Sequence, residues 1–169
     1  MARLFLFRHA KAAWAEPGMR DFDRQLDERG VEEAIAMGRL MLKRKLVPDI
    51  IFCSTAARAV QTLDAVNEAL HLNDIARYDQ NLYATDAPGY LEIAAAAGDA
   101  EDVMLVGHNP MLEDTAIALS KSGDDVSIDA LHRGFRTAGL AVIDFEGPAA
   151  SFISATGHLE AFLTPEDAP

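Results

Sequence analysis

Three short apolar runs constrain the fold of this chain more than any other feature of its sequence. They cover Leu4 to Phe7, Asp49 to Cys53, and Val103 to Val106. The leading aspartate of the second run is its one polar residue. An uninterrupted apolar run of this length is typical of a strand buried on both faces, as in a parallel sheet covered by helices. The three runs therefore predict a mostly parallel sheet.

Helical patterns separate the three runs. The first helix is expected after residues 26–30 and the second after a cap at Ser54 or Thr55, because apolar residues recur there at helical spacing. Their apolar stripes are Val31, Ile35, Gly38 and Leu42 in the first helix, and Val60, Leu63, Val66 and Leu70 in the second.

Further elements follow the same alternation. We expect a weak strand at 75–78, a helix over 88–97 closed by Gly98, a helix over 111–120, and a hairpin pairing 139–145 with 151–154. The sequence thus predicts one α/β domain over residues 1–163. It is a three-layer sandwich with a mostly parallel central sheet, helices on both faces and an antiparallel edge strand. Residues 164–169 are expected to form a frayed tail.

Charge and composition exclude several classes of function. The formal net charge is −12 and the pI about 4.7, which argues against binding to nucleic acid or to anionic membranes. No apolar run approaches the ~20 residues that cross a bilayer, and no segment resembles a signal peptide. Cys53 is the one cysteine, so no internal disulfide forms. We therefore expect a cytoplasmic protein.

Each apolar run is followed by a basic or imidazole side chain. Arg8 and His9 follow the first run, Arg58 lies in the first turn of the helix after the second, and His108 follows the third. Parallel strands end at one edge of a sheet, where ligands of α/β proteins bind, so these groups should converge. Arginine binds phosphate through its planar fork of donors, and the helix N-terminus after Ser54 favours an anion. The sequence therefore predicts a small phosphate-binding pocket.

Four stretches of the chain resemble the histidine phosphatase (phosphoglycerate mutase-like) superfamily. Residues 6–10 (Leu-Phe-Arg-His-Ala) look like its Arg-His-Gly signature, with Ala10 in place of the usual glycine. Residues 54–62 resemble its second arginine motif, and Val106-Gly-His-Asn-Pro110 its second histidine motif. Residues 23–30 resemble a stretch typical of the SixA-like phosphohistidine phosphatases. The four stretches occur in the family's order over nearly the whole chain.

The resemblance implies a role for each matching residue. His9 should attack phosphorus and form a covalent phosphohistidine, so an acceptor, such as a backbone carbonyl, should fix its tautomer. Arg8, Arg58 and His108 should contact the non-bridging oxygens. Further substrate contacts are expected from Arg24, Asn109 and Ser54. No metal or other cofactor is expected, because cationic side chains neutralise the phosphoryl group.

No general acid can be assigned from the sequence. The acidic residues of the short region between the two later motifs lie in no recognisable motif; the candidates are Asp79, Asp86 and Glu92. A phosphohistidine donor has an activated P–N bond and needs less help from an acid than an alcohol leaving group. The expected substrate is therefore phosphohistidine on a protein. Trp14 and Met19, before Arg24, fit either a lid or ordinary packing.

Several alternatives stay open or are excluded. A phosphatase of small phosphomonoesters and a phosphoglycerate mutase would use the same nucleophile, and a non-catalytic phosphoprotein-binding module would use the same pocket. A cysteine phosphatase is disfavoured, because only four residues separate Cys53 from Arg58. A P-loop nucleotidase is excluded by the missing Gly-rich motif. Metal hydrolysis is disfavoured, since the five histidines lack zinc-site spacing, and three of them have no assigned role: His71, His132 and His158.

Overall fold

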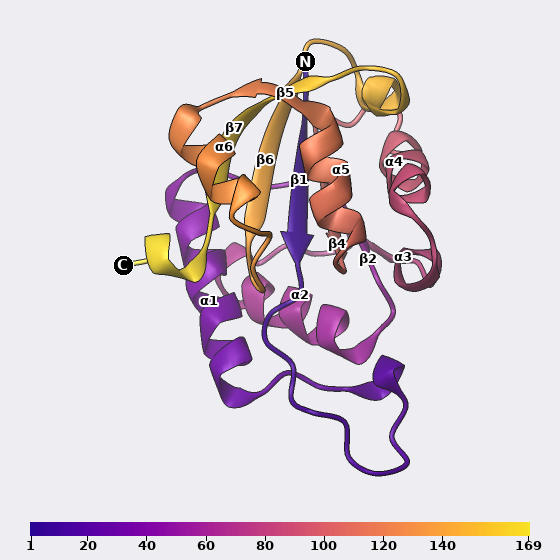
Figure 1. Cartoon of the computed structure of the whole chain (residues 1–169), viewed down its shortest axis with the longest axis vertical. Helices are drawn as coiled ribbons and strands as arrows, with labels where there is room; N and C mark the ends of the chain where they lie inside the picture. The colour runs from indigo at the N-terminus through magenta and orange to yellow at the C-terminus, as the bar shows by residue number, and fades with distance from the viewer.

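A computed structural model describes all residues, Met1–Pro169, and contains one seven-stranded sheet in the order β3-β2-β4-β1-β6-β7-β5 (Figure 1). The strands are β1 (Ala2–Arg8), β2 (Ile50–Cys53), β3 (Ala76–Tyr78), β4 (Asp102–Gly107), β5 (Ser120–Gly123), β6 (Leu140–Phe145) and β7 (Gly157–Leu163). Only β6 runs against the others, since it is antiparallel to both of its neighbours, β1 and β7. The predicted mostly parallel sheet is confirmed. The antiparallel strand lies inside the sheet rather than at its edge, because β7 and β5 add two further strands beyond it.

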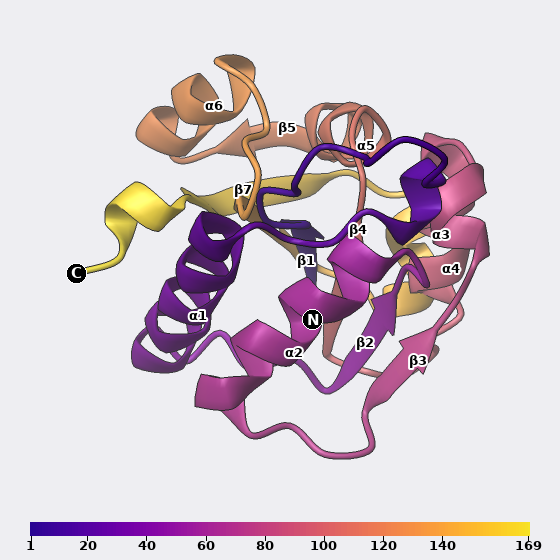
Figure 2. The same cartoon turned by 90° about the horizontal axis from the view of Figure 1, so that it is seen from below.

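Helices cover both faces of the sheet, as predicted. They are α1 (Glu28–Lys43), α2 (Ala57–Leu70), α3 (Asn81–Ala84), α4 (Ala87–Ala95), α5 (Met111–Leu119) and α6 (Asp125–His132). Three short 3₁₀ helices are η1 (Asp21–Asp23), η2 (Ala149–Ile153) and η3 (Pro165–Asp167). Figure 2 shows α1 and α2 together on one side of the sheet and α5 on the other. No helix combines the length and the apolar character needed for a membrane crossing.

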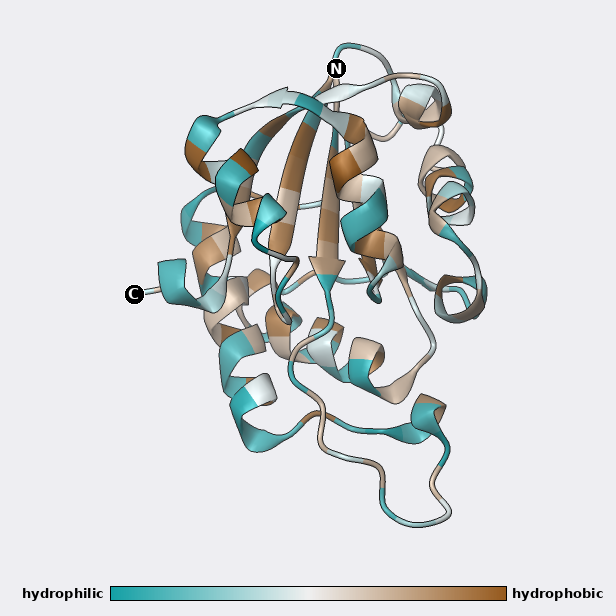
Figure 3. Ribbon diagram, viewed as in Figure 1, coloured by the Kyte–Doolittle hydropathy of each residue, from teal (hydrophilic) through white to brown (hydrophobic).

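The central strands are apolar on both faces (Figure 3). Along β1, Leu4 and Leu6 belong to the core cluster on the α4 and α5 side, whereas Phe5 and Phe7 belong to the cluster on the α1 and α2 side. All four side chains are fully buried. The alternation of faces in an extended strand explains why an uninterrupted apolar run was the signal for β1.

The second strand of the predicted hairpin was misplaced. Residues 151–154 do not form a strand, because 151–153 belong to η2 and β7 begins only at Gly157. Ser151 folds this segment into a turn, since its backbone N–H and its hydroxyl both donate to the carbonyl of Pro148. Phe152 is buried against Phe145, with the ring centroids 4.6 Å apart, and so fills the core from outside the sheet. The elements β5 and α6 were not predicted.

The buried face of α1 is rotated from the predicted stripe. Val31 and Leu42 are 38% and 51% exposed, while Met37 and Met41 are fully buried. Gly38, near the centre of the predicted stripe, is closely packed as expected, since an added Cβ there would collide with the backbone of Val66 in α2.

The start of α2 also differs from the prediction. Its N-cap is Ala56, not Ser54 or Thr55. Ser54 still contributes to this turn, because its hydroxyl oxygen accepts a hydrogen bond from the Ala56 N–H.

The expected frayed tail is folded against the domain. Thr164 caps η3 through its hydroxyl, and Asp167 accepts in return from the Thr164 backbone N–H. Glu166 forms an ion pair with Arg136 at 2.8 Å, and Ala168 packs against the core on the α1 and α2 side. A reciprocal cap and this contact anchor a segment whose composition alone suggested disorder.

Candidate active site

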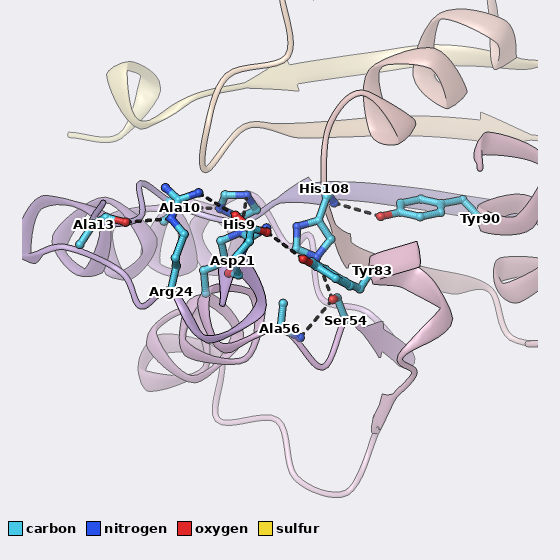
Figure 4. Close-up of polar contacts among 11 residues, drawn as sticks. His9, Ala10, Ala13, Asp21, Arg24, Ser54, Ala56, Tyr83, Tyr90 and His108 are labelled. Carbon is cyan, nitrogen blue, oxygen red and sulfur yellow. Dashed lines mark hydrogen bonds and ion pairs between the residues drawn. The ribbon is translucent and has the colours of Figure 1, made fainter. Parts of the chain in front are cut away.

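The carboxyl ends of β1, β4 and β2 meet at one edge of the sheet. The His9 N–H donates to the carbonyl of Gly107 at 3.1 Å, and the Ser54 N–H donates to the carbonyl of Val106 at 2.9 Å. These backbone bonds hold the three strand ends level. The ring centroids of His9 and His108 are 5.2 Å apart (Figure 4). The Nε atom of Arg58 lies 3.3 Å from Nε2 of His9. Three of the predicted site residues therefore meet in one small volume.

Two hydrogen bonds define the tautomer of His9. Its Nδ1 lies 2.7 Å from the backbone carbonyl of Ala10, which can only accept, so Nδ1 carries the proton. Its Nε2 faces the N–H of Arg58 and is therefore the unprotonated nitrogen. A backbone carbonyl is the kind of acceptor that the sequence analysis expected.

The environment of His9 keeps the ring neutral. The side chain is nearly buried, and this burial is the main reason that the pKa of His9 falls to about 3. The hydrogen bond to the Ala10 carbonyl opposes the change, whereas the nearby His108, Arg58 and Arg8 add to it. At neutral pH the Nε2 lone pair is consequently free of a proton, as a nucleophile requires.

A buried hydroxyl links the His9 segment to the helix that carries Arg58. Oγ1 of Thr62 accepts a hydrogen bond from the Ala10 N–H at 2.9 Å and donates to the carbonyl of Arg58 at 2.6 Å. Thr62 is fully buried. It lies in a stretch that resembles a family motif, but only the structure shows that it joins the two halves of the site.

His108 is held from two sides. Its Nε2 lies 2.8 Å from the hydroxyl of Ser54, and its backbone N–H donates to the hydroxyl of Tyr90 at 3.0 Å. The Ser54 hydroxyl accepts from the Ala56 N–H and still has one proton and one lone pair, so its bond to His108 Nε2 is compatible with either tautomer of that ring. Burial and then Arg58 lower the pKa of His108 to about 4, although Asp21 opposes them. The Nδ1 atom is buried and has no partner.

Arg8 lies beside this group without bonding to either imidazole. One terminal nitrogen donates to the carbonyl of Phe135 at 2.8 Å, while its Nε is buried and has no partner. Burial lowers the pKa of Arg8; the nearby carboxylate of Glu113 opposes this change, and Arg58 adds to it. Its guanidinium is thus close enough to Arg58 for the two charges to repel each other.

The side chains of Asn109 and Ser54 hydrogen-bond to other parts of the protein. The Asn109 amide donates to the carbonyl of Phe135 and accepts from the Glu113 N–H, so it connects α5 to the loop before β6. Ser54 supports His108, as described above. The Asn109 amide keeps a second N–H beyond the one given to Phe135, and the predicted substrate contacts of Asn109 and Ser54 stay predictions.

Arg24 reaches the site through a residue that the sequence analysis missed. Its Nε donates to the carbonyl of Ala13, and its NH1 donates to Oδ1 of Asp21 at 3.0 Å. Asp21 also binds Arg58 and the hydroxyl of Tyr83. The Tyr83 ring packs edge-on against His108, with centroids 5.5 Å apart. Nothing in the sequence marked Asp21 or Tyr83, since both act through contacts distant in the chain.

The remaining candidates have other roles. Asp79 accepts from the Asn81 N–H, and Asp86 caps α4, so both carboxylates are engaged at helix starts. Glu92 is exposed on α4. Cys53 is fully buried in the core, where burial raises the pKa of its thiol, so it lacks the thiolate character of a nucleophile.

Two neutral imidazoles and two guanidiniums lie together at one edge of a mostly parallel α/β sheet, an arrangement suited to binding a phosphoryl group. Residues 4–82 match the family model described as "Histidine phosphatase superfamily (branch 1)". An uncharacterized protein of Mycobacterium tuberculosis H37Rv is 34% identical over 94% of this chain and 99% of its own length. The chain therefore belongs to the histidine phosphatase superfamily.

Solved structures place it near one branch. The crystal structure of a candidate phosphohistidine phosphatase SixA from Agrobacterium tumefaciens is 40% identical, with a TM-score of 0.81 over 97% of this chain and 98% of that one. A second candidate SixA, from Nakamurella multipartitia, is 32% identical, with a TM-score of 0.85 over 97% of this chain and 96% of that one. The resemblance to the SixA-like branch is thereby confirmed.

Proposed function

We propose that this protein is a metal-independent phosphatase that removes phosphoryl groups from protein-bound phosphohistidine through a covalent phospho-His9 intermediate. The observation that carries the proposal is the state of His9: a buried, neutral ring with its proton on Nδ1 and its Nε2 lone pair beside Arg58. A ring fixed in this way is prepared for attack at phosphorus without a separate base.

The reaction would proceed in two displacements at phosphorus. In the first, Nε2 of His9 forms a bond to phosphorus while the P–N bond of the substrate breaks; the substrate ring, already protonated on its other nitrogen, keeps the bonding electron pair and leaves as neutral imidazole. In the second, water attacks phosphorus, the bond to His9 breaks and inorganic phosphate leaves. Both displacements require positive groups around the three non-bridging oxygens.

Arg8, Arg58 and His108 are suited to hold those oxygens. Buried polar atoms in proteins are rarely left without partners, yet Nε of Arg8 and Nδ1 of His108 are both buried and unpartnered. An oxyanion would accept a hydrogen bond from the Arg8 Nε–H, and one from His108 in the tautomer that carries its proton on Nδ1. Arg24, which already lies next to Asp21, would contribute a further cation at the rim.

Two features support a protein-bound phosphohistidine over a small ester. First, none of the carboxylates considered from the sequence is free at the site to protonate an alkoxide, and an imidazole leaving group requires less assistance. Second, Trp14 is 90% exposed on the segment between β1 and α1 that also carries Asp21. A protein partner extends far enough beyond the phosphoryl pocket to cover this ring, whereas a phosphoglycerate does not. The acidic surface and the single reduced cysteine fit a cytoplasmic enzyme that does not bind nucleic acid or membranes.

The mechanism is tested by trapping the intermediate. A labelled phosphohistidine protein should transfer acid-labile, base-stable label to the wild type and to His158→Asn, a control at an exposed histidine far along the chain. The His9→Asn variant should take up no label and show no turnover. Label in His9→Asn equal to that in the wild type would exclude His9 as the nucleophile.

The substrate preference is tested separately. The phosphohistidine protein, p-nitrophenyl phosphate and 3-phosphoglycerate should be compared by kcat/KM under the same conditions. We expect the phosphohistidine protein to react fastest. Much faster hydrolysis of the small esters would leave the nucleophile intact and overturn the proposed substrate.

A further inference from the structure

The buried guanidinium of Arg58 is bound by an acidic residue of the segment that precedes α1. One terminal nitrogen donates to the backbone carbonyl of Asp21 at 2.7 Å, and the other donates to its Oδ2 at 3.0 Å. The Arg58 side chain is only 8% exposed, whereas that of Asp21 is 52% exposed. A fixed, buried cation is therefore paired with an anion at the surface.

The Asp21 carboxylate gathers donors from three separate parts of the chain. Besides Arg58 on α2, Arg24 donates to Oδ1 at 3.0 Å, and the Tyr83 hydroxyl on α3 donates to Oδ2 at 2.9 Å. Figure 4 shows Asp21 beside His9, with Tyr83 and His108 next to it. Although partial burial opposes ionisation, the bonds from Arg24, Tyr83 and Arg58 lower the pKa of Asp21 to about 2. The carboxylate is thus a permanent anion at the mouth of the site.

We propose that Asp21 is an internal competitor of the substrate's phosphoryl group, which must displace it from Arg58 before the site can act. The inference rests on the proposed function only in taking Arg58 as a phosphoryl-binding residue. A guanidinium has five N–H donors; in Arg58 the Nε–H faces His9, and Asp21 takes one N–H of each terminal nitrogen, which leaves one N–H on each. A phosphoryl group that binds Arg58 bidentately through both terminal nitrogens would share them with Asp21, so the two anions compete for the same guanidinium.

Electrostatics favours the same exchange. A carboxylate within a few ångströms of a phosphoryl dianion is repelled by it, and the half-exposed Asp21 can move into water. In the empty enzyme, the buried guanidinium would be costly without a partner, and Asp21 supplies one. Asp21 consequently stabilises the free protein and lowers its affinity for every phosphoryl ligand, including the product, inorganic phosphate.

The segment that carries Asp21 is attached in a way that permits its displacement. Its two ends are joined by the Ala12–Leu26 bridge and by the bond from the Ala13 N–H to the Gln25 carbonyl. Between them, every residue from Ala13 to Asp21 is exposed. The pairing of Asp21 with Arg58 can therefore open while the base of the segment stays in place.

The test uses Asp21→Asn with Asp23→Asn as a matched control. Asp23 lies on the same segment and pairs with the exposed Arg20, away from Arg58. Dissociation constants for orthovanadate and inorganic phosphate should be measured by calorimetry, together with the melting temperature with and without each anion. We expect Asp21→Asn to bind both anions at least about 10-fold more tightly, because the competing charge is removed. It should melt lower than the wild type without anion and gain more from added anion. Asp23→Asn should match the wild type.

The possible results separate the inference from the proposed function. Unchanged or weaker anion binding by Asp21→Asn, with normal binding by the wild type, would refute the competition and leave the phospho-His9 mechanism standing. Loss of turnover without any change in anion affinity would place Asp21 in the chemistry and also refute it. Tighter anion binding in a protein that never labels on His9 would support the competition and refute the mechanism. If neither protein binds either anion, both proposals fail.

Discussion

Replacing Thr62 with valine tests how far the site depends on one buried hydroxyl. The hydroxyl accepts from the Ala10 N–H, one residue after the proposed nucleophile, and donates to the carbonyl of Arg58. Valine has nearly the same shape as threonine, so the change leaves no cavity. It leaves the Ala10 N–H in a buried position without a partner.

The expected loss of stability follows from that single orphaned donor. A buried polar group that loses its partner costs about 1–3 kcal/mol, so we expect the free energy of unfolding to fall by about 2 kcal/mol. For a chain of this size, that corresponds to a melting temperature lower by about 4–8 °C, measurable by calorimetry. Since Ala10 anchors the segment of His9, kcat should also fall by about 10-fold through misplacement of the ring.

Thr115 provides a control with the opposite expected sign. It is also a buried helical threonine, 1% exposed, but its Oγ1 has no hydrogen-bond partner. Thr115→Val removes an unsatisfied polar group and should leave stability unchanged or raised, with normal activity. If the two variants lost the same stability, or if Thr62→Val lost none, the hydroxyl of Thr62 would not be what joins the two halves of the site.

Three further changes test other parts of the structure. The free energy of unfolding should fall as the pH drops from about 6.5 towards about 4. In the folded protein the buried rings of His9 and His108 have pKa values of about 3 and about 4 and stay neutral, whereas the same histidines take up protons in the unfolded chain. Urea unfolding at about pH 7 and about pH 5 should show a smaller loss for His9→Asn, and an equal loss would contradict the assigned neutral ring. Trp14→Ala should lower kcat/KM for a phosphohistidine protein by about 10-fold and leave p-nitrophenyl phosphate turnover unchanged. Stability should also stay unchanged, because the ring is 90% exposed. Equal effects on both substrates would argue against docking of the protein substrate on Trp14. Cys53→Ser should retain kcat per folded molecule, and its loss would revive a cysteine nucleophile, although a hydroxyl in the core should lower the melting temperature.

The central sheet was predictable because its signal is local. Four consecutive apolar residues in β1 can only be buried together if both faces of the strand are covered, and this holds for Leu4 to Phe7. Because His9, Arg58 and His108 follow such strands in sequence, they were predicted to lie together at one edge of the sheet. The outer strands gave weaker signals. The strand β5 reads Ser-Lys-Ser-Gly and owes its conformation to pairing with β7, which no pattern within those four residues expresses.

The errors have a common physical origin in tertiary packing. The predicted α1 stripe had the right residue near its centre, Gly38, which packs closely on the backbone of Val66, yet Val31 and Leu42 at its two ends face outward. Phe152 and Ile153 looked like strand residues, but one of them fills the core from a 3₁₀ helix. Asp21 was invisible for the same reason, because its partners Arg58 and Tyr83 are 37 and 62 residues away in sequence.

One set of charges performs two functions at this site. Catalysis by His9 requires a neutral ring. Together with burial, the charges of Arg58 and Arg8 lower the pKa of His9 and so keep the ring neutral. The same two cations are suited to bind a phosphoryl dianion. A site that holds two guanidiniums beside two imidazoles is stable without substrate only if an anion balances part of the charge. The structure provides that anion on an exposed segment instead of in the core, where it could not leave. The placement of Asp21 at the surface therefore balances the charge of the empty site and still allows a phosphoryl group to replace it.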